Sequence, residues 1–402
     1  MNLNKNYLRQ NLNSSNKKLN EQIMILKLIA KSKTPLTIPE ISEKLLLSVP
    51  TITSSVSDLI EDRWVTIGGK KKTSQGRKPT MYKVNSSAFY IVGVKIGFKE
   101  LVVIYTDINM KLIEQKRLKN FKLNDNEQCL SQIVNFIKST LQENKLDNKN
   151  VLGIGIGITG RVNKFSGGSN SFFKFAGPSL EDFLSEKLKI EVFLENDTRV
   201  AGITEKEYGV SKNSPNCLFV NIDEGLGMSI IINNQVVTGT NGYAGEFGHM
   251  KFGKKKRTCI CGKVGCLGTE VSGFALKLDL EEKLKEGILS NHFKQGDKPE
   301  YEDIVLAATK GDFLAIEIIQ HQGKILGKSL GDIVNLISPD EIVIGGKVKD
   351  SGNIFLDSVK MGLNSSVLPD VFDTNKVYLS NIKDETRLAG LSCLVLKEYN
   401  LY

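Results

Sequence analysis

The chain has 402 residues, of which 40% are hydrophobic and 25% charged, a composition typical of a globular protein with two or three structural units. No apolar run approaches the ~18 residues that span a bilayer. The polar, Asn-rich start also lacks the apolar core of a secretory signal. We therefore expect a cytoplasmic protein with no membrane partner.

The net charge of +9 is concentrated at one end of the chain. Residues 1–85 carry fifteen Lys and Arg against six Asp and Glu, whereas the remaining residues carry 39 of each sign. An excess confined to one segment indicates a polyanionic partner for that segment. Charge alone is equally compatible with a solvated Lys-rich tail, so the pattern of the apolar residues has to decide.

Residues 19–85 predict three helices after a polar tail, residues 1–18, which we expect to be disordered. The first helix is dense in apolar residues and ends before Pro35. The second covers about residues 38–45, with a proline in its first turn, where the missing N–H costs nothing. A three-residue turn follows, and Ser48 is the expected N-cap of the third helix. This order predicts a helix-turn-helix.

The third helix combines an apolar face with a face of small polar residues. Apolar residues recur at i, i+4, i+7 and i+8, namely Ile52, Val56, Leu59 and Ile60. We expect the opposite face, which also carries Asp58, to contact DNA through Pro50, Thr51, Ser54 and Ser55. Small hydroxyl side chains allow close approach to a major groove and can bond phosphates or base edges.

Two short strands around a basic loop predict a wing. Residues 64–67 and 81–84 flank a Gly- and Lys-rich loop. Arg77 and Lys78 at its tip are predicted to enter a minor groove, where A·T-rich narrowing attracts arginine.

A helical bundle that only packs on the rest of the protein explains the apolar periodicity equally well. It does not explain why the turn, the polar face and the wing coincide with the excess charge, so we predict double-stranded DNA as the partner.

Beyond residue 85, short β-rich runs alternate with longer helices in two similar sets. Residues 90–106 predict a hairpin, and residues 151–158 alternate glycine with apolar residues, as in a buried strand that other backbone approaches closely. Residues 301–335 predict a helix, and residues 387–398 a closing helix. The pattern predicts an α/β fold of two lobes with a cleft. The expected boundaries are residues 86–198 for the first lobe, closed by residues 386–402, and residues 199–385 for the second.

A histidine and three of the six cysteines gather in one short segment. They are His249, Cys259, Cys261 and Cys266. One imidazole and three thiolates form a closed tetrahedral set suited to one structural Zn²⁺ per chain, and a reducing cytosol disfavours disulfides. Gly262 and Gly265 allow the chain to turn tightly around the ion. The alternative is three free thiols beside an incidental histidine. The scattered Cys129, Cys217 and Cys393 are typical of inert core residues.

Several motifs together resemble the ROK family (repressors, open reading frames and kinases). The segment of residues 239–249, Gly-Thr-Asn-Gly-Tyr-Ala-Gly-Glu-Phe-Gly-His, is followed by the cysteine cluster of residues 259–266. Residues 153–162, 195–199 and 338–346 resemble further family motifs. With the winged helix, the resemblance covers nearly the whole chain and is to the xylose- and N-acetylglucosamine-type repressors of the family. It implies an actin-like, or ribonuclease-H-like, pair of lobes.

The resemblance implies a sugar pocket built from Asn196, Asp197, Glu246 and His249. Carboxylates and amides can bond vicinal hydroxyls in pairs, and a zinc-bound imidazole can direct its second ring nitrogen at the sugar. Family members carry a glutamate two residues after the last zinc cysteine. This chain has Gly268 there, so Glu270, two residues further on, is the remaining candidate. Solvated loop charge is the alternative role for Glu246 and Asp197.

The resemblance also raises an ATP-dependent sugar kinase, residual or bifunctional, as the alternative function. Kinases of the family carry Asp-x-Gly-x-Thr on the first hairpin, whereas this chain has Lys95-Ile-Gly-Phe-Lys99. An ammonium therefore replaces the carboxylate that organises Mg²⁺. Asp223 and Glu224 in the second glycine motif would repel a triphosphate. Asp197 keeps the position of the catalytic base, but we expect no enzymatic activity.

The prediction is a transcriptional repressor of carbohydrate-utilisation genes. A homodimer or higher homo-oligomer would hold two winged helices against a palindromic operator. A sugar or sugar phosphate bound in the cleft of the two-lobed part would favour a different arrangement of the lobes. It can do so only because its affinity differs between the two states of the protein. A constitutive structural DNA binder that has lost its effector, and an activator, remain as alternatives.

Overall fold

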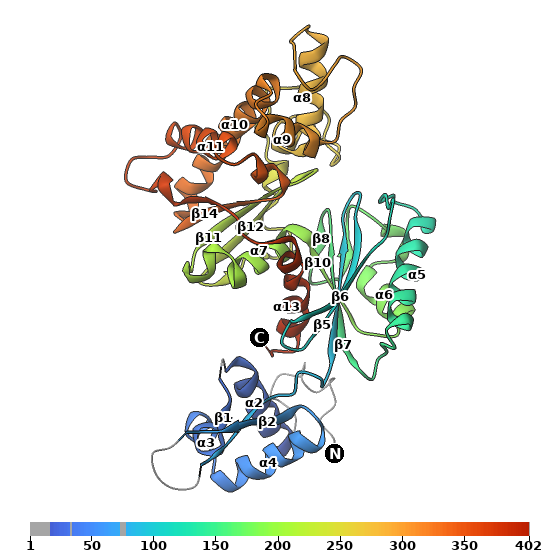
Figure 1. Cartoon of the computed structure of the whole chain (residues 1–402), viewed down its shortest axis with the longest axis vertical. Coiled ribbons are helices and arrows are strands. Elements are labelled where there is room, and N and C mark those ends of the chain that lie inside the picture. Colours follow the sequence, from blue (N-terminus) through green and yellow to red (C-terminus); the bar gives the residue numbers. More distant parts are fainter. Residues whose placement is uncertain (1–16, 33, 73–77, 402) are drawn as a thin grey trace. The chain divides into compact units, whose positions relative to one another are not determined.

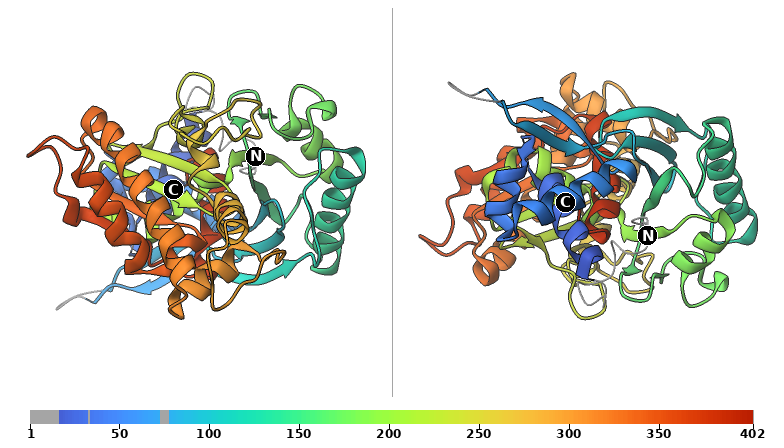
Figure 2. Two further views of the ribbon diagram at one scale, coloured as in Figure 1. Left: turned by 90° about the horizontal axis from the view of Figure 1, so that it is seen from above. Right: turned by 90° about the horizontal axis from the view of Figure 1, so that it is seen from below.

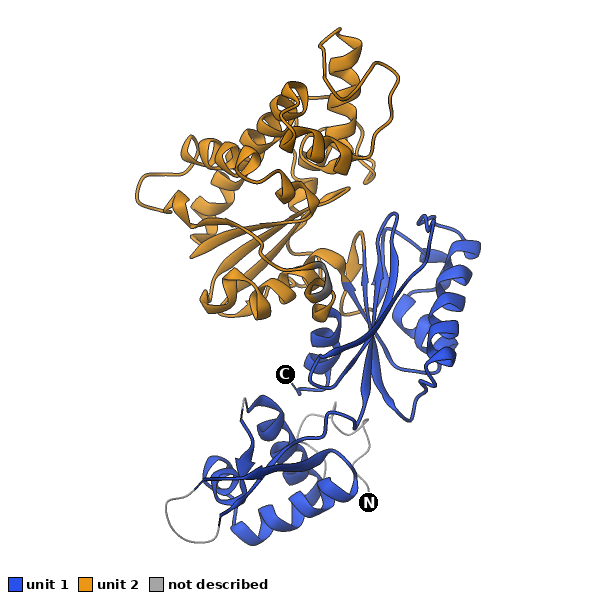
Figure 3. Ribbon diagram, viewed as in Figure 1, with its two compact units in different colours: residues 1–158, 167–195, 391–402 blue, residues 159–166, 196–390 orange. Residues whose placement is uncertain are grey.

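The computed structural model describes residues 17–32, 34–72 and 78–401. These fall into two compact units, residues 1–158, 167–195 and 391–402, and residues 159–166 and 196–390 (Figure 3). Residues 1–16 of the predicted tail and Arg77 of the predicted wing tip lie outside the described residues. Within the described ranges, no helix combines the length and apolarity that a bilayer crossing requires.

The first unit begins with a winged helix-turn-helix (Figure 1). Its helices are α2 (Lys17–Lys31), α3 (Ile38–Leu45) and α4 (Val49–Glu61). Its sheet has the order β1 (Leu36–Thr37), β3 (Thr80–Val84), β2 (Val65–Lys70). Leu46 ends α3 in the left-handed conformation at φ 54°, and the Ser48 side chain caps α4 by accepting the N–H of Thr51. The predicted N-cap and turn are confirmed.

A five-stranded sheet forms the rest of the first unit. The strands run in the order β10 (Val192–Asn196), β7 (Val151–Ile158), β4 (Tyr90–Ile96), β5 (Leu101–Asp107), β6 (Leu112–Arg117). The predicted hairpin is β4 paired antiparallel with β5, and β4 pairs parallel with β7. Figure 1 shows α5 (Glu127–Glu143) and α6 (Leu180–Leu188) on one face and α13 (Ala389–Glu398) on the other.

Strand β7 carries the close backbone approach that its glycines predict. All eight of its residues are buried. A Cβ built on Gly155 would lie 2.2 Å from the carbonyl oxygen of Leu391, at the start of the first unit's share of α13. Only glycine leaves room for the helix at this distance. The prediction for residues 151–158 is therefore confirmed.

The second unit contains another five-stranded sheet with helices on both faces. Its strands run in the order β13 (Gln235–Val236), β12 (Leu226–Ile232), β11 (Cys217–Ile222), β14 (Glu341–Gly345), β15 (Val377–Leu379). Strands β11, β14 and β15 are parallel. One face packs on α7 (Asp197–Tyr208), and the other lies against α8 (Gly273–Lys285), α9 (Tyr301–Thr309), α10 (Phe313–Ile337) and α11 (Asn353–Asn364). Helices α10 and α11 lie side by side in every view (Figures 1 and 2).

Two predicted helices are each divided in the structure. Residues 301–335 form α9 and α10, because Gly311 turns the chain at φ 88° and Asp312 caps α10 by accepting the N–H of Ala315 at 2.9 Å. The closing segment of residues 387–398 overlaps the end of a short α12 (Asp384–Arg387) and then forms α13. The mixed α/β architecture, with one five-stranded sheet in each unit, agrees with the prediction.

Candidate functional site

The outer face of α4 differs in part from its prediction. Pro50 and Ser54 are exposed, and Thr51 is half-buried, so these three side chains are accessible. Ser55 is only 1% exposed and lies in the core of the winged helix, so its assignment to the DNA-contacting face was wrong. Ile60 is 38% exposed, so its assignment to the buried face was also wrong.

Helical geometry explains both corrections. At about 100° per residue, position 55 lies about 60° from Ile52, whereas position 60 lies about 80° from it. The buried stripe is therefore Ile52, Ser55, Val56 and Leu59. The complementary stripe adds two exposed hydroxyl residues that the prediction missed, Thr53 and Ser57. The i, i+3, i+4, i+7 spacing from Pro50 would have identified them.

The base of the wing is tied to α3 by a charged contact. The ammonium of Lys71 lies 2.5 Å from Oε1 of Glu40, whose other oxygen accepts the N–H and O–H of Thr37. The hydrogen bond from Lys71, supported by the bonds from Thr37, lowers the pKa of Glu40 to about 2. Lys78, predicted at the wing tip, is exposed. The contact holds the strand that leads into the basic loop against the helix-turn-helix.

The four predicted metal ligands converge in the second unit. Their ligand atoms all lie within 4.8 Å of one another: His249, Cys259, Cys261 and Cys266. Nδ1 of His249 is 3.5 Å from Sγ of Cys259, and the sulfurs of Cys261 and Cys266 are 3.6 Å apart. A tetrahedron with metal–sulfur bonds of about 2.3 Å has edges of about 3.8 Å, so the spacing fits a metal ion at the centre.

Tight turns and an external anchor shape the loop that carries the cysteines. Gly262 and Gly265 adopt φ values of 86° and 79°, in the left-handed region that glycine favours. Arg257 donates to the carboxylate of Asp279 in α8 at 2.7 Å and to the carbonyl of Thr269 at 3.1 Å. Asp279 is buried, so the loop is fixed to the helical layer by a contact shielded from water.

The second ring nitrogen of His249 faces away from the sulfurs. It lies 3.8 Å from the carboxylate of Glu246. Burial raises the pKa of Glu246, with Asp197 adding to the rise and the cations of Arg199 and Arg161 opposing it. Burial, with Arg161 nearby, lowers the pKa of His249, which favours the neutral ring that a metal requires. The structure thus gathers Asp197, Glu246 and His249, and adds the two arginines that the prediction missed.

Asn196 also belongs to this region, but its side chain has a structural role. Its Oδ1 accepts the N–H groups of Thr198 and Arg199 at 3.0 and 3.1 Å, and its Nδ2 donates to the carbonyl of Gly160 at 2.7 Å. It therefore caps α7 and ties the helix start to the loop that follows β7. These bonds orient the neighbouring Asp197.

Glu270 lies apart from this arrangement. It is 4% exposed, and its Oε1 accepts the N–H of Lys255 at 2.7 Å, so it supports the backbone of the metal loop. This placement argues against Glu270 as the substitute sugar ligand. At the position where the family carries glutamate, a Cβ on Gly268 would lie 3.2 Å from the carbonyl of Gly248, a tight fit.

Both loops that correspond to kinase phosphate loops contain paired charges. In the first unit, Lys95 lies 3.0 Å from Glu100. Although burial opposes it, Lys95 and Arg117 lower the pKa of Glu100. In the second unit, Asp223 lies 2.5 Å from Arg387, and Glu224 lies 2.6 Å from Lys277. The predicted repulsion of ATP by Asp223 and Glu224 therefore needs correction, because both carboxylates are neutralised by a neighbouring cation.

Fold and site together define a class: an α/β protein with two five-stranded sheets and a His/Cys₃ cluster beside a polar constellation, preceded by a winged helix-turn-helix. The ROK family model matches residues 91–398, and the chain belongs to the ROK family. The resemblance seen in the motifs is thereby confirmed.

Two curated relatives match over almost the whole chain. A xylose repressor of Bacillus spizizenii is 27% identical over 388 residues, covering 95% of this chain and 96% of the relative. An N-acetylglucosamine repressor of Escherichia coli O6:H1 is 26% identical over 369 residues, covering 90% and 88%.

Solved structures support the same fold. A ROK family transcriptional regulator, described as a homolog of the E. coli MLC protein, has a TM-score of 0.80 at 24% identity and covers 96% of this chain and 97% of that one. A ROK family glucokinase from Streptomyces griseus, in complex with glucose and AMPPNP, has a TM-score of 0.64 at 22% identity, with coverages of 76% and 98%. The kinase match covers a smaller share of this chain than the regulator match.

Proposed function

We propose that the protein is a DNA-binding transcriptional repressor of carbohydrate-utilisation genes, whose operator affinity is controlled by a sugar or sugar phosphate. The observation that carries the proposal is the exposed hydroxyl face of α4, next to a basic wing, in the segment that holds the chain's excess positive charge. The names of the xylose and N-acetylglucosamine repressors support the regulatory role.

The DNA contacts are assigned to accessible residues of α4 and the wing. Ser54, with Thr53 and Ser57, would face the major groove, where small hydroxyls bond base edges or phosphates. Pro50 and Thr51 lie in the first turn of the same helix. Arg77 and Lys78, predicted at the tip of the wing, would enter a minor groove. A homodimer would place two such modules on a palindromic operator, as the symmetry of the pair requires.

The effector site is assigned to Asp197, Glu246 and His249, with Asn196 fixing the start of α7. Glu246 and Asp197 offer carboxylate oxygens to sugar hydroxyls, and Nε2 of His249 adds a ring nitrogen. Arg161 and Arg199 lie near enough to lower the pKa of Glu246. The effector would act by binding one state of the protein more tightly than another.

The His/Cys₃ cluster is proposed to hold Zn²⁺ with a structural role. Three thiolates and one imidazole close a tetrahedral site, which leaves no position for a reacting water. Bound there, zinc would cross-link the loop and orient His249. His249, held through Nδ1, would then keep Nε2 directed at Glu246.

A kinase activity is not part of the proposal. Lys95 stands where family kinases carry the carboxylate that organises Mg²⁺, and it is engaged by Glu100. Because phosphoryl transfer depends on positioning and on metal-held charge, this exchange removes a central part of the machinery. A coupled assay with ATP, Mg²⁺ and a panel of hexoses and pentoses should show no turnover above a protein-free blank; turnover would restore the kinase alternative.

The DNA-binding part is tested by selection from a random duplex pool. The purified full chain should enrich a palindromic sequence in ~0.15 M salt, where non-specific binding is weak. Ser54→Asp, which places a carboxylate on the proposed contact face, should bind the enriched sequence at least tenfold more weakly. Equal affinity of wild type and variant for that sequence would place the DNA contact elsewhere.

A further inference from the structure

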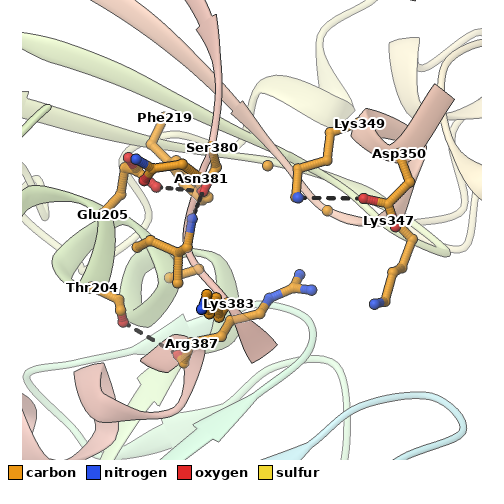
Figure 4. Close-up of a pocket in the computed structure, with 14 residues that line it drawn as sticks. Thr204, Glu205, Phe219, Lys347, Lys349, Asp350, Ser380, Asn381, Lys383 and Arg387 are labelled. Carbon is orange, nitrogen blue, oxygen red and sulfur yellow. Dashed lines mark hydrogen bonds and ion pairs between the residues drawn. The ribbon is translucent and has the colours of Figure 1, made fainter. Parts of the chain in front are cut away.

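A cavity of about 410 Å³ opens within the second unit at the carboxyl ends of β14 and β15 (Figure 4). Its walls come from α7, from the turn after β14 and from the segment that follows β15. None of its lining residues belongs to the constellation of Asp197, Glu246 and His249. Ligands of open α/β sheets bind beyond the carboxyl ends of parallel strands, so the cavity has the position of a binding site.

Bare backbone forms the floor at the end of β14. Gly346 has a φ of 86°, and a Cβ there would lie 2.1 Å from the carbonyl oxygen of Ile222. A Cβ on Gly345 would lie 2.5 Å from the ring of Phe219. Glycine is therefore required at both positions, because Ile222 and Phe219 already fill the space that a side chain would take.

The charged side chains that line the cavity are mostly cationic. Four are basic, Lys347, Lys349, Lys383 and Arg387, and two are acidic, Glu205 and Asp350. Asp350 is paired with Lys349 at 3.3 Å. Figure 4 shows Glu205 and Ser380 on one side, Lys347 and Lys349 on the other, and the Arg387 side chain extending between them.

Glu205 is engaged by other groups of the protein. It is fully buried, its Oε2 accepts the hydroxyl of Ser380 at 2.6 Å and its Oε1 accepts the N–H of Val210 at 2.8 Å. Burial raises its pKa. Its oxygens therefore serve the end of α7 and the segment after β15, and the basic side chains of the lining outnumber its carboxylates.

Arg387 is held in place from outside the cavity. Its Nη2 donates to Asp223 at 2.5 Å and to Asn221 at 3.1 Å, and neither residue lines the cavity. A guanidinium fixed in this way binds an oxyanion with less loss of side-chain freedom than a mobile lysine. The combination of a fixed arginine and several lysines is the chemistry that recognises a phosphate group.

We propose that this cavity binds the phosphate group of a small phosphorylated metabolite, at a second ligand site separate from the proposed sugar effector site. The volume lies within the roughly 300–1,000 Å³ of small-molecule sites. The ligand would contact both Lys347 after β14 and Lys383 after β15. The second contact lies on the segment through which the chain leaves the second unit for α13.

The test is calorimetric titration of the full chain with inorganic phosphate and, separately, with glucose 6-phosphate, at constant ionic strength. Both probes should bind, and Lys347→Gln/Lys383→Gln should weaken binding at least tenfold. The matched control is Lys376→Gln, an exposed lysine before the amino end of β15 and outside the lining, which should leave the affinity unchanged. The exposed single variant Lys383→Gln repeats the test with the smallest risk to folding.

A Glu246→Gln background separates the two ligand sites. Phosphate binding should persist there, and glucose 6-phosphate should retain the component that depends on Lys347 and Lys383. The proposal is overturned if neither probe binds, or if the cavity variants bind as tightly as wild type. If inorganic phosphate binds and glucose 6-phosphate does not, the proposal of a phosphorylated metabolite is overturned and the cavity is a site for free phosphate. Each of these negative results would leave the proposed sugar control intact, because that control depends on Glu246 and not on the cavity.

Discussion

Nε2 of His249 lies 3.8 Å from the carboxylate of Glu246. The other nitrogen of the same ring faces the cysteine sulfurs, so one imidazole joins the metal cluster to the polar constellation. A change in the cluster should therefore reach the proposed effector site through the orientation of this ring. Variants of the metal cluster and of the proposed effector site can separate the two effects.

Cys261→Ser should abolish the metal site. Replacing one of the three thiolates removes a strong ligand, so metal content should fall from about one ion per chain toward zero after dialysis, and the thermal midpoint should fall with it. Elemental analysis measures the content directly. The control is Cys129→Ser, a buried cysteine outside the cluster, which should retain the ion. Full metal content in Cys261→Ser would contradict the four-ligand assignment.

Glu246→Gln should weaken effector binding and spare the metal. Loss of the carboxylate removes a charge-assisted bond to a sugar hydroxyl, for which about tenfold in affinity is expected. A thermal-shift screen of sugars and sugar phosphates identifies the ligand, and calorimetry then measures its affinity for wild type and variant. In contrast, Glu270→Gln should loosen the metal loop, because its carboxylate supports the N–H of Lys255. An equal loss of effector affinity in the two variants, with metal retained in both, would refute the distinction.

Ser54 and Ser55 should behave differently despite being adjacent. Ser54 is exposed and Ser55 is 1% exposed. We expect Ser54→Asp to weaken operator binding at least tenfold through repulsion of phosphates, with little change in stability. Ser55→Asp would bury a charge and should destabilise the winged helix by several kcal/mol. Operator affinity and urea unfolding, read from the fluorescence of the single tryptophan, Trp64, separate the two effects. Normal stability of Ser55→Asp would contradict its buried position.

Glu40 should make the stability of the winged helix sensitive to acid. Its folded-state pKa, about 2, lies below the value of about 4.3 for an unfolded chain. The stabilisation is therefore complete above the unfolded value and is lost as the pH falls from about 4 toward 2. Glu40→Gln should lower stability at neutral pH by about 0.5–1 kcal/mol and flatten the acid dependence. Unfolding followed by Trp64 fluorescence at each pH measures this stability. The control is Glu43→Gln, at an exposed position on the same helix, which should match wild type.

Local sequence signals were sufficient for several parts of the structure. The cap at Ser48, the glycine strand around Gly155 and the four metal ligands all depend on residue type and short spacing, and all are found where predicted. Ser55 was misplaced because residue polarity was weighed above helical angle. A serine can lie in a buried stripe when its neighbours at three and four residues are apolar.

Long-range pairing explains the remaining differences. The carboxylate of Asp223 is neutralised by Arg387, which lies 164 residues further along the chain. The cavity beyond β14 and β15 likewise combines α7 with segments more than a hundred residues away. No local pattern marks these encounters, because they depend on strand order and on the packing of the sheet.

The most direct test of the account is the affinity of the full chain for its selected operator, measured by fluorescence anisotropy with and without each sugar and sugar phosphate. The account predicts that one of these ligands weakens operator binding at least tenfold in wild type, and that Glu246→Gln needs about ten times more of it for the same effect. A wild-type affinity that no ligand of the panel alters, or the same dependence on ligand concentration in Glu246→Gln, would contradict sugar control through this site.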